Sequence, residues 1–160
     1  MNGSDFILDK TDYAILRLMQ ENARITNADI ARELTMAPSA VLERVKKLEA
    51  RHVIVGYTTQ LNPAALQQQL LAFVFMKSAE GYGCSTTGMA LAKIPEVQEV
   101  HHIAGEDCYL VKLRTTDSAS LMHLMRSAFS KIPNIISTRT TIVLETIKEK
   151  QHLIIPDKQQ

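Results

Sequence analysis

Residues 26–57, the stretch that decides the fold, read TNADIARELTMAPSAVLERVKKLEARHVIVGY. They predict a short helix, a tight turn, a second helix and a short strand, with basic side chains concentrated on the second helix. This is the layout of a helix-turn-helix DNA reader followed by a β-wing. We expect the residues before it to support it and the residues after it to form a separate sensing and assembly domain.

Capping residues predict where three helices begin. Asp9, with Asp12 three residues later, forms a capping-box pair for a first helix. Thr26 and Asp29 repeat the pattern for a second helix. Pro38 lies in the first turn of a third helix, where a missing N–H costs little.

The third helix has a buried face and an outward face. Apolar residues at i, i+3, i+4 and i+7 spacing predict the buried face: Val41, Leu42, Val45 and Leu48. After the helix, residues 53–55 and 57–61 read as a strand pair bent at Gly56, which is the expected wing. Asn62 and Pro63 end this unit.

The outward face of the third helix carries the residues that we predict to contact DNA: Ser39, Ala40, Glu43, Arg44, Lys46, Lys47 and Arg51. The first four lie near the helix N-terminus, where Arg can grip guanine and Glu can accept from cytosine N4. The last three are expected to meet phosphates. Glu43 has an alternative role, which is to orient Arg44 or Lys47 through a salt bridge. For the whole helix the alternative is a solvated amphipathic face.

The spacing of apolar residues changes in the second half of the chain. The pattern predicts strands at 70–78, 97–104, 109–115 and 135–147, and helices at 85–93 and 118–131. This βαββαβ order is ferredoxin-like, so the fold class is α+β, with two helices covering one face of an antiparallel sheet. Strand runs that are apolar on both faces predict that another subunit covers the sheet. The expected domains are 1–61 (winged helix-turn-helix), 62–69 (linker), 70–150 (ferredoxin-like) and 151–160 (tail).

Several classes of protein are disfavoured. Cys84 and Cys108 are too few and too widely spaced for a disulfide framework or a C-x-x-C zinc site. His101 and His102 adjoin on a strand and face opposite ways, so we expect no metal site. No phosphate-loop or nucleophile-elbow pattern supports catalysis, so we expect neither an enzyme nor a cofactor. The start of the chain does not read as a signal peptide and the most apolar run, 70–76, is too short to cross a bilayer, which predicts a cytoplasmic protein without membrane contact.

Several segments together carry a family resemblance, through their order and spacing: L-D-x-x-D-x-x-I-L from residue 8, LERVKKLE from 42, IVGYT from 54, LNP from 61, VQEVHHIAGEDCYLVK from 97 and IPNIISTRTTIVLETIK from 132. They resemble the Lrp/AsnC feast/famine transcription regulators over almost the whole chain. The resemblance implies an N-terminal winged helix-turn-helix and a C-terminal ferredoxin-like regulatory domain. It also implies dimers formed through that domain, commonly octamers of four dimers, and amino acids bound at dimer–dimer contacts.

This chain departs from the family pattern at four places. Thr35 replaces a usual glycine in the turn before the third helix, and Ala37 replaces a usual serine cap. His52 replaces a usual glycine at the end of that helix, where we expect a positive φ. In the effector-loop pattern, Asp107 stands one residue earlier than the family's second acid.

The resemblance implies an effector site at residues 105–109 and on the last strand. Its candidate residues are Ile103, Gly105, Glu106, Asp107, Cys108, Tyr109, Thr138 and Thr140. Glu106 or Asp107, with backbone groups of the loop, would receive the ammonium of an amino acid, and the two threonines would bind its carboxylate. Ile103 and Tyr109 suit an aliphatic side chain such as that of leucine or methionine. The alternative is a plain hairpin turn.

The sequence therefore predicts a transcription regulator that binds double-stranded DNA, responds to a small amino acid and is built on homodimers. The alternative is a ferredoxin-like metabolite-binding or enzymatic protein that uses the helix-turn-helix only for protein–protein contact. Steep salt dependence of binding to duplex DNA separates the two.

Overall fold

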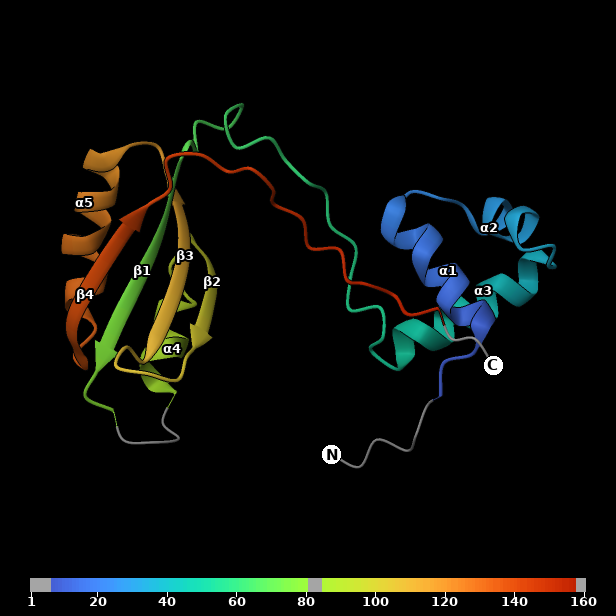
Figure 1. The fold of residues 1–160 in the computed structure, drawn as a ribbon, viewed down its shortest axis with the longest axis horizontal. Helices are drawn as coiled ribbons and strands as arrows, with labels where there is room; N and C mark the ends of the chain where they lie inside the picture. The colour runs from blue at the N-terminus through green and yellow to red at the C-terminus, as the bar shows by residue number, and fades with distance from the viewer. Residues whose placement is uncertain (1–6, 81–84, 158–160) are drawn as a thin grey trace. The chain divides into compact units, whose positions relative to one another are not determined.

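The computed structural model describes residues 7–80 and 85–157 of the 160-residue chain. The chain forms two compact units (Figure 1): residues 1–60 together with 149–160 make the first, and residues 61–148 make the second. The polypeptide therefore passes from the first unit to the second and back again. Cys84 and the ends of the predicted first domain and tail lie outside the described residues.

The first unit contains α1 (Lys10–Glu21), α2 (Asn27–Glu33) and α3 (Pro38–Ala50). The predicted capping box of α1 is confirmed: the Asp12 amide donates to Asp9 Oδ1 over 2.8 Å, and the Asp9 amide donates to Asp12 Oδ2 over 3.2 Å. Thr26 caps α2 as expected, since its hydroxyl oxygen accepts from the Asp29 amide. Pro38 begins α3, and Ala37 before it provides no side-chain cap.

One face of each helix builds the core of the first unit, which contains Ile15, Ile30, Ala31, Val41, Val45 and Leu48. The prediction that Leu42 belongs to this core is wrong, because its side chain is 38% exposed. Successive helical residues differ by about 100° in direction. Leu42 therefore turns to the edge of the stripe that Val41 and Val45 define.

The predicted wing is also wrong in the described structure, where residues 53–61 contain no strand. Val53 and Ile54 pack against the helical core, but Val55 is 88% exposed. A strand needs a ladder of backbone hydrogen bonds to a partner, and these runs donate to the end of α3 instead: the amides of Val53 and Ile54 both bond Leu48 O. The Tyr57 hydroxyl donates to Glu49 Oε1 over 2.7 Å, which holds the segment on α3.

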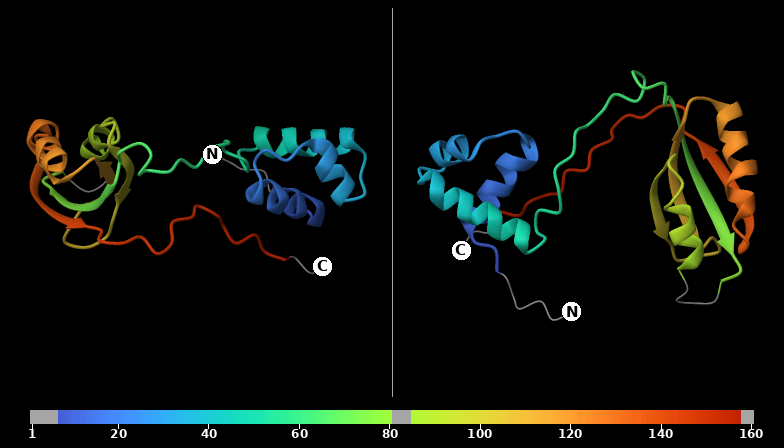
Figure 2. Two further views of the ribbon diagram at one scale, coloured as in Figure 1. Left: turned by 90° about the horizontal axis from the view of Figure 1, so that it is seen from above. Right: turned by 180° about the vertical axis from the view of Figure 1, so that it is seen from behind.

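The described part of the second unit contains four strands and two α-helices. The two helices lie on the same face of the sheet (Figures 1 and 2). In chain order its elements are β1 (Leu70–Ser78), α4 (Thr86–Leu91), β2 (Val97–His102), β3 (Tyr109–Thr115), α5 (Ser118–Ser127), the 3-10 turn η1 (Phe129–Lys131) and β4 (Ile135–Ile142). The strand order is β2-β3-β1-β4, and all neighbours are antiparallel. The predicted βαββαβ ferredoxin-like arrangement is confirmed.

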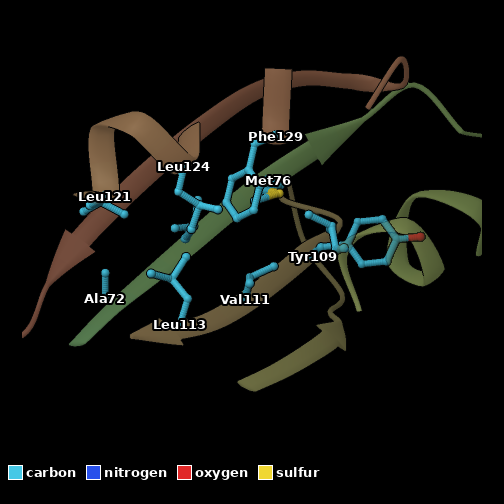
Figure 3. Packing of buried hydrophobic residues seen from close by; sticks show 10 residues of the cluster. Ala72, Met76, Tyr109, Val111, Leu113, Leu121, Leu124 and Phe129 are labelled. Carbon is cyan, nitrogen blue, oxygen red and sulfur yellow. The ribbon is translucent and has the colours of Figure 1, made fainter. Parts of the chain in front are cut away.

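Alternation along the two central strands places the core between sheet and helices (Figure 3). Ala72, Val74 and Met76 of β1 face the helices, as do Tyr109, Val111 and Leu113 of β3. Leu121 and Leu124 of α5 and Phe129 of η1 pack onto them. The opposite face of the sheet carries Phe73 and Phe75 of β1, both half-buried in the single chain.

Four predicted elements end earlier than expected. The helix expected at 85–93 spans only Thr86–Leu91. The strand expected at 97–104 ends at His102 because the chain turns there into the loop before β3. The helix expected at 118–131 ends at Ser127 and continues as η1, which places Phe129 in the core. The strand expected at 135–147 ends at Ile142, which pairs with Ala72 near the start of β1. The Val143 amide makes one more bond to β1, to Leu71 O over 2.9 Å. Because β1 begins at Leu70, residues farther along have no residue of β1 left with which to extend the ladder.

Candidate nucleic-acid interface and effector site

The start of α3 is presented by a tight turn after α2. The Met36 amide bonds Ala31 O over 2.8 Å and the Thr35 amide bonds Arg32 O, which is the Schellman pattern. Thr35 accordingly has a φ of 53°. The turn leaves Ser39 and Ala40 exposed on the first turn of α3. These are the positions predicted to face base edges.

The end of α3 has the same geometry. The amides of Val53 and His52 bond the carbonyls of Leu48 and Glu49, each over 2.9 Å. His52 has a φ of 55°, so the prediction of a positive φ there is confirmed. The C-terminal ends of α2 and α3 are thus both closed by backbone hydrogen bonds around a residue other than glycine.

Arg44, one of the predicted DNA-contact residues, forms ion pairs with two carboxylates at the start of α1. Its Nη1 donates to Asp9 Oδ2 and to Asp12 Oδ1, each over 2.7 Å. Asp12 is only 5% exposed, so its carboxylate depends on this partner for charge compensation. Hydrogen bonds from Arg44 to Asp9 and then Asp12 raise the pKa of Arg44. Arg44 therefore joins the start of α1 to the middle of α3, while its contact with DNA stays a prediction.

The other predicted contacts lie on the exposed surface of α3. Glu43 pairs with Lys46 at 3.8 Å, a geometry of little energetic weight between exposed groups. Lys46, Lys47 and Arg51 are exposed. Arg44, Lys46 and Lys47 also line an open groove of about 670 Å³ that extends to the acidic start of α1. The basic side chains that we expect to contact phosphates therefore lie exposed along the middle and the C-terminal end of α3.

The predicted effector loop is closed as a hairpin. The Ile103 amide donates to Cys108 O over 2.9 Å, and the Cys108 amide donates to Met76 O over 2.8 Å. Gly105, with φ 137°, and Glu106 are exposed at its tip. Asp107 accepts from Arg139 Nη2 over 2.9 Å, and the Arg139 guanidinium lies 4.0 Å from the centre of the Phe75 ring. Arg139 was not among the predicted residues, although its neighbours Thr138 and Thr140 were, and alternation along β4 puts it on the opposite face from both.

Tyr109 lies in the core and not at the loop surface. Its hydroxyl donates to Glu80 Oε2 over 3.2 Å, and its ring stacks on His102 with centroids 5.0 Å apart. Burial raises its pKa. A Cβ added at Gly88 of α4 would come within 2.9 Å of the Tyr109 ring, so a glycine permits this close packing. Glu80, which sequence reasoning missed, also accepts from the Thr87 amide and the Asn134 side chain.

Sheet register separates the remaining effector candidates. Thr138 pairs with Met76 and Thr140 with Val74, so both threonines lie on the helix-covered face, at the exposed edge strand. Arg139 pairs with Phe75 and lies with Asp107 on the open face. A single chain therefore does not bring Asp107 and the two threonines to one side of the sheet.

Across residues 7–80 and 85–157, no group of three His, Cys, Asp or Glu side chains could hold a metal ion. Within those same ranges, no helix has the length and apolar character needed to cross a membrane.

Comparison with known proteins matches each of the two units to a known domain family. A family model described as the AsnC-type helix-turn-helix domain matches residues 8–49, and one described as the Lrp/AsnC ligand binding domain matches residues 71–153. Leucine-responsive regulatory proteins of Haemophilus influenzae and Escherichia coli K12 are each 34% identical to this chain over 150 residues. These alignments span 92% of this chain and 90% and 92% of those proteins, respectively.

Solved structures agree with this assignment. A transcriptional regulator from Neisseria meningitidis in complex with L-methionine is 28% identical, with a TM-score of 0.85 over 92% of this chain and 97% of that one. A feast or famine regulatory protein from Mycobacterium tuberculosis complexed with L-methionine is 30% identical, with a TM-score of 0.85 over 94% and 100%. This family is non-enzymatic, which disfavours the alternative of an enzyme. The chain belongs to the Lrp/AsnC family and is a DNA-binding transcription regulator with an amino-acid ligand-binding domain.

Proposed function

We propose that this chain binds double-stranded DNA as a homodimer that assembles further to an octamer, and that leucine or methionine is its effector. The observation that carries the DNA-binding part of this proposal is the exposed N-terminal face of α3. A tight turn presents this face, and exposed cations follow it along the helix. Two such helices in a symmetric dimer would read an imperfect palindrome with half-sites one or more helical turns apart.

The roles on α3 divide by position. Ser39, Ala40 and Glu43 are proposed to meet base edges in the major groove. Lys46, Lys47 and Arg51 are proposed to meet phosphates, which supply affinity and salt dependence. Arg44 keeps its proposed place at the interface, and its two carboxylate partners support a second role, which is to hold α3 at a set angle to α1.

The open face of the sheet is proposed as the dimer interface. Phe73 and Phe75 lie on it beside Arg139, whose guanidinium covers the Phe75 ring. An apolar sheet face exposed in a single chain is usually covered by a partner. Light scattering tests this: we expect Phe75→Glu to lower the assembled mass, and Lys93→Glu, at an exposed position just after α4 and away from the open face, to leave it unchanged.

The effector site is proposed at residues 103–109 together with Thr138 and Thr140. Because one chain places these groups on two faces of the sheet, a complete site needs a second copy. The L-methionine complexes of the Neisseria and Mycobacterium proteins support an amino acid as the ligand. Ligand binding at a subunit contact would change assembly or DNA affinity if the ligand prefers one arrangement.

One experiment tests DNA binding and effector response together. Affinity for duplex DNA is measured over a range of salt while leucine, methionine and the other amino acids are added singly. We expect one of them to change affinity or assembled mass, and Asp107→Asn or Thr140→Val to remove that response while basal DNA binding persists. If every amino acid is without effect while DNA binding is intact, the effector proposal is wrong.

We also propose that the functional boundaries are 1–61 for DNA binding, 62–69 for the linker, 70–150 for effector binding and assembly, and 151–160 for the tail. A cytoplasmic location follows from the proposed access to chromosomal DNA. Fractionation of cells that carry a tagged chain would test it.

A further inference from the structure

The C-terminal segment returns to the DNA-binding unit. After β4 the chain leaves the second unit, and residues 149–157 cluster with α1, α2 and α3 of the first unit, where the red end of the ribbon meets α1 (Figure 1). The described part of this segment, residues 149–157, is not helix or strand. Its place is therefore set by specific contacts and not by its own secondary structure.

Two side chains of α1 hold the segment. The Leu153 amide donates to Gln20 Oε1, and Gln20 Nε2 donates to Leu153 O, both over 2.8 Å. The side-chain amide of Gln20 thus bonds both the backbone N–H and the backbone carbonyl of Leu153, as a neighbouring strand would. One turn earlier, Arg17 donates to Pro156 O over 2.8 Å and forms an ion pair with Asp157.

The segment lies along an apolar groove of about 450 Å³. Leu8, Leu16 and Met19 of the α1 region line it together with Val53, Ile54 and residues 151–156 of the segment itself. Ile155 is half-buried there, whereas Leu153 is 76% exposed and Ile154 is 97% exposed. Backbone hydrogen bonds to Gln20 and Arg17, more than burial of side chains, therefore hold the segment in place.

We propose that residues 151–157 are a docking segment for α1 of their own chain, so that the DNA-binding unit is built from two separate stretches of sequence. The docked segment gives this unit a second covalent connection to the ferredoxin-like unit, beside the linker. Its contacts lie on α1, the helix whose start is joined to α3 through Arg44. The proposal needs neither DNA nor an amino acid, and it goes beyond the function proposed above.

Cross-linking tests which chain supplies the segment. In a full-length chain with Cys84→Ser and Cys108→Ser, the variants Ala23→Cys and Ile154→Cys place thiols at two exposed positions that line the groove. A short bis-maleimide is expected to join them within one chain, giving a product of monomer mass. A product of twice that mass would show that a second copy supplies the segment, and no product would show that it does not dock. Either result overturns the proposal.

Hydrogen exchange tests the contact itself. We expect the Leu153 amide to exchange slowly and Gln20→Ala to speed its exchange on the order of tenfold, since one substitution removes both hydrogen bonds. Glu21→Ala, at the exposed neighbouring position of α1, should leave the rate unchanged. Fast exchange in the unmodified chain would overturn the proposal. Both experiments omit DNA and ligand, so their failure leaves the proposed amino-acid response untouched.

Discussion

At the scale of single residues, two helix ends in the DNA-binding unit have a positive φ without glycine. Thr35 follows α2 with φ 53°, and His52 follows α3 with φ 55°. A β-branched residue is strained in this region because its Cβ substituents crowd the backbone, whereas histidine tolerates it better. The strain persists because the Schellman hydrogen bonds fix both turns.

Replacing Thr35 with glycine is expected to stabilise the DNA-binding unit. Glycine has no Cβ, so the variant should gain about 1 kcal/mol in free energy of unfolding, offset slightly by the greater entropy of its unfolded chain. Chemical denaturation followed by far-ultraviolet circular dichroism measures the change. Thr35→Ala is the matched control: it keeps a Cβ and should gain much less. An equal gain for both would mean that the φ of Thr35 is not the cause.

We expect Arg44 to stabilise the fold of the DNA-binding unit in the absence of DNA. Arg44→Met leaves the buried Asp12 carboxylate without its cationic partner, which should cost about 2 kcal/mol. Lys46→Met, two residues on, removes an exposed cation with a weak partner and should cost less than about 0.5 kcal/mol. Denaturant titrations of the two variants compare them. Equal stability would show that Arg44 does not anchor α3.

At the scale of elements, α1 connects the other parts of the DNA-binding unit. Its first turn, through Asp9 and Asp12, holds Arg44 of α3, and its later turns, through Arg17 and Gln20, hold the C-terminal segment. Besides packing Ile15, Leu16, Leu18 and Met19 into or against the core, α1 thus fixes both neighbours through polar contacts.

The contact between α1 and α3 should weaken in acid. Burial alone would raise the pKa of Asp9, but hydrogen bonds from the Asp12 amide and from Arg44 lower it overall. A lowered folded-state pKa adds stability that is present above the unfolded value, near 3.9, and is lost as the pH falls through the folded value. We expect Asp9→Asn, which still caps α1, to lose less stability between about pH 5 and pH 2. Identical pH profiles would contradict this.

The 3-10 turn η1 is expected to be essential to the second unit because it carries Phe129. This side chain is fully buried against the sheet, as Figure 3 shows. Phe129→Ala should cost about 3–5 kcal/mol through lost burial and a residual cavity. Met122→Ala removes an exposed side chain of α5 and should change the free energy of unfolding by less than about 0.5 kcal/mol. Hydrogen exchange along β1 and β3 assigns the loss to this unit.

At the scale of the whole molecule, DNA binding should be strongly salt-dependent although the net charge is only +1. The cations that we expect to contact phosphates are grouped on α3. The salt dependence of binding is therefore set by this local charge and not by the net charge of the chain. Lys47→Ala should weaken binding to all sequences and lower the slope of log affinity against log salt by about one. Lys93→Ala, an exposed lysine of the second unit, should leave that slope unchanged. Equal slopes for both variants would place Lys47 away from phosphate.

The sequence by itself determined the elements that local chemistry specifies. The capping box at Asp9, the proline start of α3 and the limits of β1 and β3 follow from side chains close in sequence, and the structure has them as predicted. The βαββαβ order follows from periodicity, and the positive φ of His52 follows from the way α3 ends.

Only the tertiary structure decided features that depend on partners distant in sequence. A strand exists only where another strand bonds it, so the wing is absent from the described residues and β4 stops at Ile142. Arg44 meets Asp12, and Arg139 meets Asp107, across 32 residues each. Leu153 reaches Gln20 across 133 residues. Local patterns carry no information on such pairs, because charge compensation and backbone pairing depend on where the folded chain brings each group.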